Sequence, residues 1–201
     1  MTLSGSKIYG PKSSGSLYVR NKSLIAPLLR GGDQEMGLRA GTEDIAQVIG
    51  FTQALKIARE IAESESTRLG ELQNFFFAEL KKNIPGIVVN GSESERIPNN
   101  INISIPGISG ERIIIELDAR GICASSKSAC KEDEDEVSHV IAAIRKTPHP
   151  SSLPKGEAAA TEGSVRFSMG RGTTKADIKK TVANLAAIVT TIKNFQEKNQ
   201  I

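Results

Sequence analysis

The stretch "NNINISIPG", residues 99–107, decides the fold of the second half of this chain. Its isoleucines alternate with polar residues, which is typical of a β-strand that buries one face. A second stretch, "SVRFSMG" (164–170), alternates in the same way and places Arg166 on the face opposite its apolar residues. The pattern predicts two strands whose apolar faces share a core.

Helices and shorter strands are expected around these two. The segment "SGERIIIELDARG" predicts a short helix that ends at Gly121, because glycine readily adopts the left-handed conformation that closes a helix. Thr174 is expected to cap a C-terminal helix. Together these segments predict a compact α+β domain over residues 85–201. The elements expected in it are strands at 86–91, 99–107, 122–126 and 164–170, helices at 109–121, 137–145 and 174–192, and a loop at 147–163.

The first part of the chain has a different character. Apolar residues at helical spacing between 42 and 84 predict one very long helix or two joined ones, with Gly70 as a possible break. Thr42 is expected to cap this helix at its start. Residues 1–41 contain a strand at 15–20 but little core of their own. We therefore expect three parts: 1–41 as the end of a larger domain, 42–84 as a linking helix or helix pair, and 85–201 as the small domain.

Composition limits the function. The chain has 201 residues, of which 38% are apolar and 24% charged, as in ordinary globular proteins. It has neither an apolar run long enough to span a membrane nor a signal peptide. Two cysteines cannot form a disulfide framework, so we expect a cytoplasmic protein. A net charge of +3 and 4% aromatic residues argue against direct nucleic-acid binding.

Two segments in the first part of the chain contain candidate binding residues. Lys7 lies among serines and glycines, where a lysine with a lowered pKa can form a Schiff base and a phosphate finds donors, although most such lysines are solvated. Arg39 and Thr42 lie where a glycine-containing loop enters a helix, which is a favourable place for an anion. Alternatively, Thr42 only caps the helix and Arg39 pairs with Glu35 or Glu43.

The second part contains an arginine and both cysteines. Arg166 presents a guanidinium that binds carboxylates through two parallel hydrogen bonds, although an arginine on an exposed strand face is also common. Cys123 is expected to be a small buried residue. For Cys130 the possible roles are a core residue, a metal ligand, half of a disulfide and a nucleophile, but it lies in the polar stretch "SSKSACKEDEDEV" (125–137), where burial is not expected. A metal site is the weakest of these, since neither histidine follows at a familiar ligand spacing.

Taken together, several stretches resemble the cysteine desulfurases of the NifS/IscS type. These are pyridoxal 5′-phosphate enzymes with the class V aminotransferase fold, an α/β fold of type I. The resemblance implies that residues 1–41 end the large cofactor-binding domain and that 85–201 form the small one. The stretches that carry it are "SGSKIYGPKSSGSLYVR", "RGGDQEMGLRAGTEDI", "NNINISIPGI", "GICASSKSAC", "VSHVIAAI" and "VRFSMGRGTT".

The resemblance implies a role for each cofactor-binding candidate. Lys7 would bind pyridoxal 5′-phosphate as a Schiff base and move the Cα proton of the substrate. Ser4 would donate to the cofactor phosphate, and Ser6, at a position where the family usually has histidine, can do the same. Thr42 would reach the phosphate bound by the other subunit of a homodimer.

The resemblance also implies a substrate and a product. Arg166, with Arg39, would bind the substrate L-cysteine. Cys130 would attack the substrate sulfur, leaving alanine and a persulfide on the protein. The persulfide would pass to a sulfur acceptor such as a scaffold or carrier protein, for iron–sulfur clusters or tRNA thiolation. A polar loop can move between substrate and acceptor, which a packed strand cannot.

The chain also departs from the family pattern. Ser13 and Lys127 stand where glycine is more usual. The family's complete chain is roughly twice as long, and its first half carries the histidine, aspartate and glutamine around the cofactor ring. We therefore expect the C-terminal half of such an enzyme, with little activity unless an N-terminal half is supplied. The alternatives are another class V enzyme, such as a selenocysteine lyase, and a non-catalytic sulfur-relay or interaction module.

Overall fold

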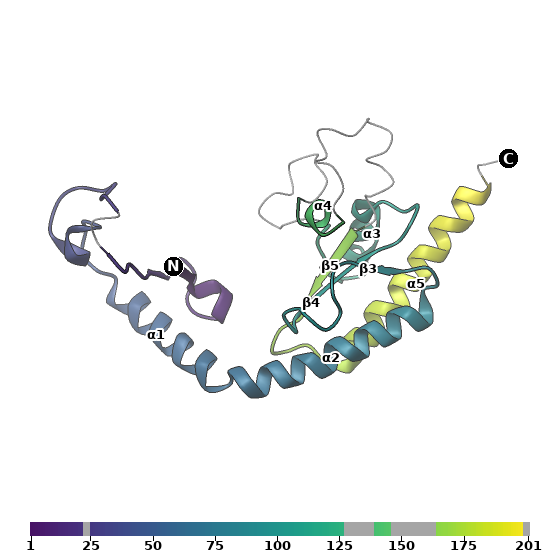
Figure 1. Ribbon diagram of the computed structural model, residues 1–201, viewed down its shortest axis with the longest axis horizontal. Helices are drawn as coiled ribbons and strands as arrows, with labels where there is room; N and C mark the ends of the chain where they lie inside the picture. The colour runs from purple at the N-terminus through teal and green to yellow at the C-terminus, as the bar shows by residue number, and fades with distance from the viewer. Residues whose placement is uncertain (22–24, 127–138, 146–163, 199–201) are drawn as a thin grey trace. The chain divides into compact units, whose positions relative to one another are not determined.

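The computed structural model describes residues 1–21, 25–126, 139–145 and 164–198. The chain divides into two compact units, Met1–Ser64 and Glu65–Ile201 (Figure 1). The division falls inside the segment 42–84 that was expected to link two domains. Each unit is described on its own.

The second unit is built on a three-stranded antiparallel sheet with β4 (Asn100–Ser104) in the middle. On one side β4 pairs with β3 (Val88–Val89), and on the other with β5 (Ser164–Ser168). The alternation predicted for β4 and β5 is confirmed, because Ile101, Ile103 and Ile105 and their neighbours Val165, Phe167 and Met169 are all buried. The opposite face of the sheet is therefore polar.

Three helices cover the apolar face of this sheet: α2 (Ala62–Asn83), α3 (Gly110–Asp118) and α5 (Lys175–Lys198). Each contributes apolar residues at helical spacing to one continuous core. Phe76 of α2, for example, meets Phe167 with ring centroids 5.3 Å apart. The fully buried helical residues of this core include Leu80, Ile113, Leu117, Ile178, Val182, Leu185 and Ile188.

The ends of two helices follow the sequence signals. Gly121 has a φ of +70° just beyond α3, as predicted for a helix stop. The Thr174 Oγ1 atom accepts from the backbone N–H of Asp177 at 3.2 Å, and the Asp177 carboxylate accepts from the Thr174 N–H at 2.9 Å. These reciprocal bonds form a capping box at the start of α5. The bonds from the Thr174 hydroxyl and N–H lower the pKa of Asp177.

The first unit contains a small hairpin and one helix. Residues Thr2–Ser4 (β1) pair antiparallel with Gly15–Leu17 (β2), so the predicted strand 15–20 is shorter and has a partner that the sequence did not indicate. Short turns of 3₁₀ type lie at Gly5–Ile8 (η1) and Gln34–Gly37 (η3). The helix α1 spans Ile45–Glu60.

Two predictions about the helical segment were wrong. Thr42 does not cap α1: the cap is Asp44, whose carboxylate accepts from the N–H of Gln47 at 3.1 Å. Gly70 does not break the helix either, since it lies inside α2, and the break between α1 and α2 falls at Ile61. Among the helices within the described residues, none has the length and apolar character needed to cross a membrane.

Candidate functional site

The first group of candidate residues lies around η1. Ser4 ends β1, and Ser6 and Lys7 follow within the 3₁₀ turn. The hydroxyl oxygens of the two serines are 3.1 Å apart, and all three side chains are exposed. Two hydroxyl groups and an ammonium group are thus available to a ligand from three neighbouring positions of the chain.

The loop that carries Lys7 is held by backbone hydrogen bonds and close packing. The N–H of Gly5 donates to the carbonyl of Ser14, and the N–H of Gly10 to that of Gly5, both at 2.8 Å. A Cβ atom on Gly5 would lie 2.0 Å from the Ser14 hydroxyl oxygen, so a larger residue there would displace the Ser14 side chain. On the other side of the loop, Pro11 lies directly against Gly50 of α1. Lys7 is therefore carried by a loop that is fixed to a helix.

The departure from the family pattern at Ser13 has a structural counterpart. Ser13 has a φ of +66°, in the left-handed region that favours glycine. The backbone conformation expected for glycine is thus present although the residue is serine.

Arg39 and Thr42 lie in the same unit and have few partners. The Arg39 guanidinium donates to the carbonyl of Ala40, and it forms no ion pair with Glu35 or Glu43. The hydroxyl of Thr42, which does not cap α1, makes no hydrogen bond to any residue that the structure describes. Neither of the two simpler explanations for these side chains therefore applies.

Arg166 is the candidate residue of the second unit. It lies in the middle of β5, directly opposite Asn102 of β4, and both side chains project from the polar face of the sheet. Its backbone also pairs with Ser125, the single bridge formed in the predicted strand 122–126. The Nε atom of Arg166 is buried and has no hydrogen-bond partner within the described part of the chain. Such an atom has lost its water without gaining an acceptor.

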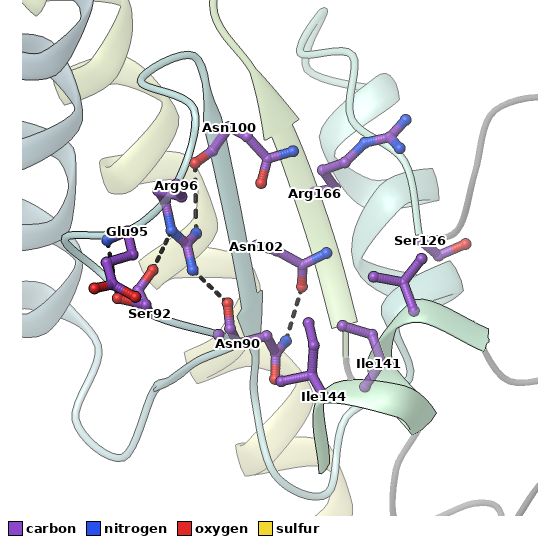
Figure 2. A pocket seen from close by; sticks show the side chains of 12 residues that line it. Asn90, Ser92, Glu95, Arg96, Asn100, Asn102, Ser126, Ile141, Ile144 and Arg166 are labelled. Carbon is purple, nitrogen blue, oxygen red and sulfur yellow. Dashed lines mark hydrogen bonds between the residues drawn. The ribbon is translucent and has the colours of Figure 1, made fainter. Parts of the chain in front are cut away.

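The Arg166 side chain lines an open cavity of about 490 Å³ on the polar face of the sheet (Figure 2). One wall consists of asparagines from the sheet, and the other of apolar side chains from α4 (His139–Arg145). The lining residues are Asn90, Gly91, Ser92, Glu95, Arg96, Asn100, Asn102, Ser126, Val140, Ile141, Ile144 and Arg166. A small ligand with a polar and an apolar part matches these two walls.

The asparagines of this cavity were not singled out from the sequence. Asn102 accepts from Asn90 at 2.8 Å, and Arg96 bonds to the backbone around both. The sequence pattern that could have indicated them is "NNINISIPG", because the alternation that buries the isoleucines also turns the asparagines to the opposite face of the strand.

The structure describes only one of the two cysteines that the sequence analysis considered. Cys130 lies outside the described residues. Cys123 was predicted to be buried, and this is wrong, since it is exposed. The predicted strand 122–126 forms only the bridge at Ser125, so alternation along it does not determine burial. Within the described ranges no three histidine, cysteine or acidic residues gather as a metal site would require.

The predicted site residues therefore fall into two groups, one in each unit. Ser4, Ser6 and Lys7 are brought together around η1. Arg166 lies on the sheet of the second unit, with polar neighbours that sequence reasoning had missed.

Comparison with known proteins places this chain in a family. The model of the family described as "Aminotransferase class-V" matches residues 1–181. The chain is 38% identical over 200 residues to "Cysteine desulfurase IscS" of Dictyoglomus turgidum, covering 100% of this chain and 48% of that protein. It is 38% identical over 194 residues to "Cysteine desulfurase NifS" of Azotobacter vinelandii, covering 96% and 46%. The chain thus spans about half the length of the curated relatives that it matches.

A solved structure supports the fold. The chain is similar to a "NifS-like protein" with a TM-score of 0.77 and 24% identity, over 94% of this chain and 46% of the other. Together with the match to the family model, this likeness confirms the predicted fold class, that of the pyridoxal-phosphate-dependent transferases of type I. The chain belongs to the class V aminotransferase family, whose members are pyridoxal 5′-phosphate-dependent enzymes.

Proposed function

We propose that this chain is the C-terminal portion of a cysteine desulfurase, which removes sulfur from L-cysteine and leaves L-alanine. The observation that carries this proposal is the environment of the Arg166 side chain. Its side chain lines a cavity with a polar and an apolar wall, and its buried Nε has no partner among the described residues. A substrate carboxylate would supply the missing acceptor.

The residues around η1 fit the cofactor. The Ser4 and Ser6 hydroxyls, 3.1 Å apart, are donors of the kind that a phosphate accepts from, and Lys7 offers the amine that an aldehyde requires. When bound, pyridoxal 5′-phosphate supplies a ring that withdraws electrons and makes the Cα–H of an amino acid acidic. Lys7, placed beside that carbon, would take the Cα proton and return it.

Two further residues of the first unit have a proposed anionic partner. The Thr42 hydroxyl, without a partner among the described residues, would donate to the cofactor phosphate of the other subunit in a homodimer. Arg39, which has no acidic partner among the described residues, would support binding of the substrate. Both assignments are those that the resemblance to the cysteine desulfurases implies.

Cys130 would receive the sulfur. The C–S bond of L-cysteine breaks and an S–S bond to the Cys130 sulfur forms, so a thiol and L-cysteine become a persulfide and L-alanine. The carbon that loses sulfur is reduced and the sulfur is oxidised, so no external redox partner is needed. In a cytoplasmic enzyme of this type the persulfide would pass to a scaffold or carrier protein for iron–sulfur clusters or tRNA thiolation.

Covalent labelling of the 201-residue chain tests the cofactor assignment. The chain is mixed with pyridoxal 5′-phosphate and reduced with borohydride, and the modified lysines are mapped by mass spectrometry. We expect label at Lys7 well above that at Lys12, which lies in the same loop and serves as the internal control. A Lys7→Ala variant should lose this label, and a Lys12→Ala variant should keep it.

Label spread over many lysines, or equal at Lys7 and Lys12, would contradict the cofactor assignment. The test does not require turnover, which we expect to be low because the chain spans about half the length of its relatives. Steady release of alanine from the isolated chain would show that expectation to be wrong.

A further inference from the structure

We infer that Asn102 donates a second hydrogen bond to the carboxylate that Arg166 binds, and so helps to set the orientation of the substrate. This inference rests on the proposed function, in which Arg166 binds L-cysteine. It adds a residue that neither the motifs nor the chemistry of the reaction had indicated.

The strand register places the two side chains together. Asn102 and Arg166 are directly opposite in the antiparallel pair of β4 and β5. Directly opposed residues have Cβ atoms about 4.5–5.5 Å apart. The flanking pairs, Ile101 with Phe167 and Ile103 with Val165, point to the core. Asn102 and Arg166 are thus neighbours on the opposite face of the sheet.

The amide of Asn102 is oriented by a neighbour. Its Oδ1 atom accepts from Asn90 Nδ2 at 2.8 Å, and the same Asn90 amide donates to the Ser104 hydroxyl at 2.9 Å. With its oxygen engaged toward Asn90, Asn102 directs its NH₂ group the other way. Figure 2 shows the nitrogen of Asn102 on the side toward β5. This NH₂ group has no acceptor among the residues that the structure describes.

Asn90 is itself fixed in place by Arg96. The guanidinium of Arg96 donates to the backbone carbonyls of Asn90, Ser92 and Asn100 and lies 5.3 Å from the centre of the Phe77 ring. In addition, the backbone N–H of Asn90 donates to the Asn102 carbonyl at 2.9 Å. The donor group of Asn102 is thus oriented before any ligand arrives, which reduces the entropy lost on binding.

The cavity favours an anion at this point. Arg166 and Asn102 both carry N–H donors and both line the cavity; in Figure 2 the Arg166 guanidinium points away from Asn102, so it would turn toward the amide to share one carboxylate. Glu95 is the acidic residue among the lining side chains, and it forms no ion pair with Arg166. The apolar side chains of α4 supply the other wall, where the rest of a small amino acid finds room.

A titration by nuclear magnetic resonance tests the inference on the intact 201-residue chain without cofactor. The probe is L-cysteine under reducing conditions, and L-cysteine methyl ester, which lacks the carboxylate, is the control ligand. We expect the Arg166 Nε–H and Asn102 Nδ2 signals to shift with L-cysteine along one binding curve. The ester should shift neither.

Single-residue variants distinguish the contribution of Asn102 to binding from that of Arg166. Asn102→Ala should raise the Kd for L-cysteine by about tenfold, equivalent to about 1.4 kcal/mol. Asn102→Asp should abolish binding, because its carboxylate competes for Arg166. Ser168→Ala is the control, since Ser168 lies on the same face of β5 as Arg166 but is not among the residues that line the cavity, and it should change the Kd by less than about twofold. Unchanged spectra of core methyl groups show that each variant is folded.

The outcomes distinguish the inference from the function on which it rests. If Arg166→Ala loses binding while Asn102→Ala binds as tightly as the wild type, the inference is wrong and the Arg166 assignment stands. If Arg166→Ala also binds normally, or the wild type shows no shift at either residue, both are overturned. A Kd that rises equally in Ser168→Ala and Asn102→Ala would contradict the specific role of Asn102.

Discussion

The backbone angle φ of Ser13 introduces strain into the loop that carries Lys7. Its φ of +66° lies in the left-handed region, where a Cβ atom crowds the following carbonyl. The turn there also has a weak hydrogen bond, from the N–H of Ser14 to the carbonyl of Pro11 at 3.4 Å. This position is therefore strained with serine and would be relaxed with glycine.

We predict that Ser13→Gly stabilises the first unit by about 0.5–1 kcal/mol, after allowing for the greater freedom of glycine in the unfolded chain. The measurement is urea denaturation of the variant and the wild type. Ser16→Gly is the control, because Ser16 lies in β2, where glycine gains nothing and should destabilise. A loss of stability in Ser13→Gly would mean that the angle of Ser13 is not under strain.

For single residues, local sequence patterns predicted the position of some side chains correctly and of others wrongly. Arg166 was placed on the correct face because β5 is a regular strand with buried neighbours on its other face. Thr42 was not the helix cap, because Asp44 lies two residues later and is an equally good cap, and local sequence does not decide between them. Cys123 was predicted to be buried from a strand pattern in a segment that forms only one bridge.

Helix α1 holds the Lys7 loop through a glycine. A Cβ atom on Gly50 would lie 2.5 Å from the Cγ atom of Pro11, closer than two carbon atoms can approach. Helical propensity alone favours alanine at such a position by about 1 kcal/mol. The glycine is thus explained by packing against the loop and not by the helix.

We predict that Gly50→Ala destabilises the first unit by about 1–3 kcal/mol and speeds amide exchange in residues 5–15, because Pro11 must move. Gly70→Ala is the matched control: Gly70 lies inside α2, and apart from the backbone of its own helix turns no atom of the described residues lies within 4 Å of its added Cβ. That variant should gain up to about 1 kcal/mol. The measurements are hydrogen exchange by mass spectrometry and urea denaturation. If both variants stabilise the chain, the contact between α1 and the loop is not what requires Gly50.

Helices and strands were predictable where the regular spacing of their buried residues extends over enough residues to be recognised. The helices α3 and α5 and the strands β4 and β5 each carry several buried residues at regular spacing. By contrast, β1 has three exposed residues and is defined by its pairing with β2, which is tertiary information. The break at Ile61 carries neither glycine nor proline, so no local signal marks it.

Across the whole molecule, the two units differ in the apolar surface that they bury. The second unit has one continuous core that draws on three helices and two strands. In the first unit, the buried apolar side chains among the described residues are Phe51 and Ala54. Large side chains of α1 such as Ile45, Val48 and Ile49 are more than half exposed. Burial of apolar surface is the main stabilising contribution, so the first unit should be the less stable.

We predict that the isolated chain unfolds in two steps, with the first unit unfolding first. The sequence supplies a selective probe, because it has no tryptophan and its two tyrosines, Tyr9 and Tyr18, both lie in the first unit. Tyrosine fluorescence should therefore follow that unit alone. Far-UV circular dichroism should instead follow mainly the helices of the second. In urea, the fluorescence midpoint should lie at least roughly 1 M below the main dichroism transition, the shift that about 2 kcal/mol produces.

Core variants in each unit separate the two transitions. Phe51→Ala should move the fluorescence transition to lower urea and leave the main dichroism transition in place. Ile103→Ala, in the centre of β4, should move the dichroism transition by a few kcal/mol, and any effect on fluorescence should be smaller. Coincident midpoints in the wild type, or equal shifts of both signals in either variant, would mean that the two units fold as one. The Lys7 loop would then have the stability of the whole chain, and its order would not depend on the small contact with α1.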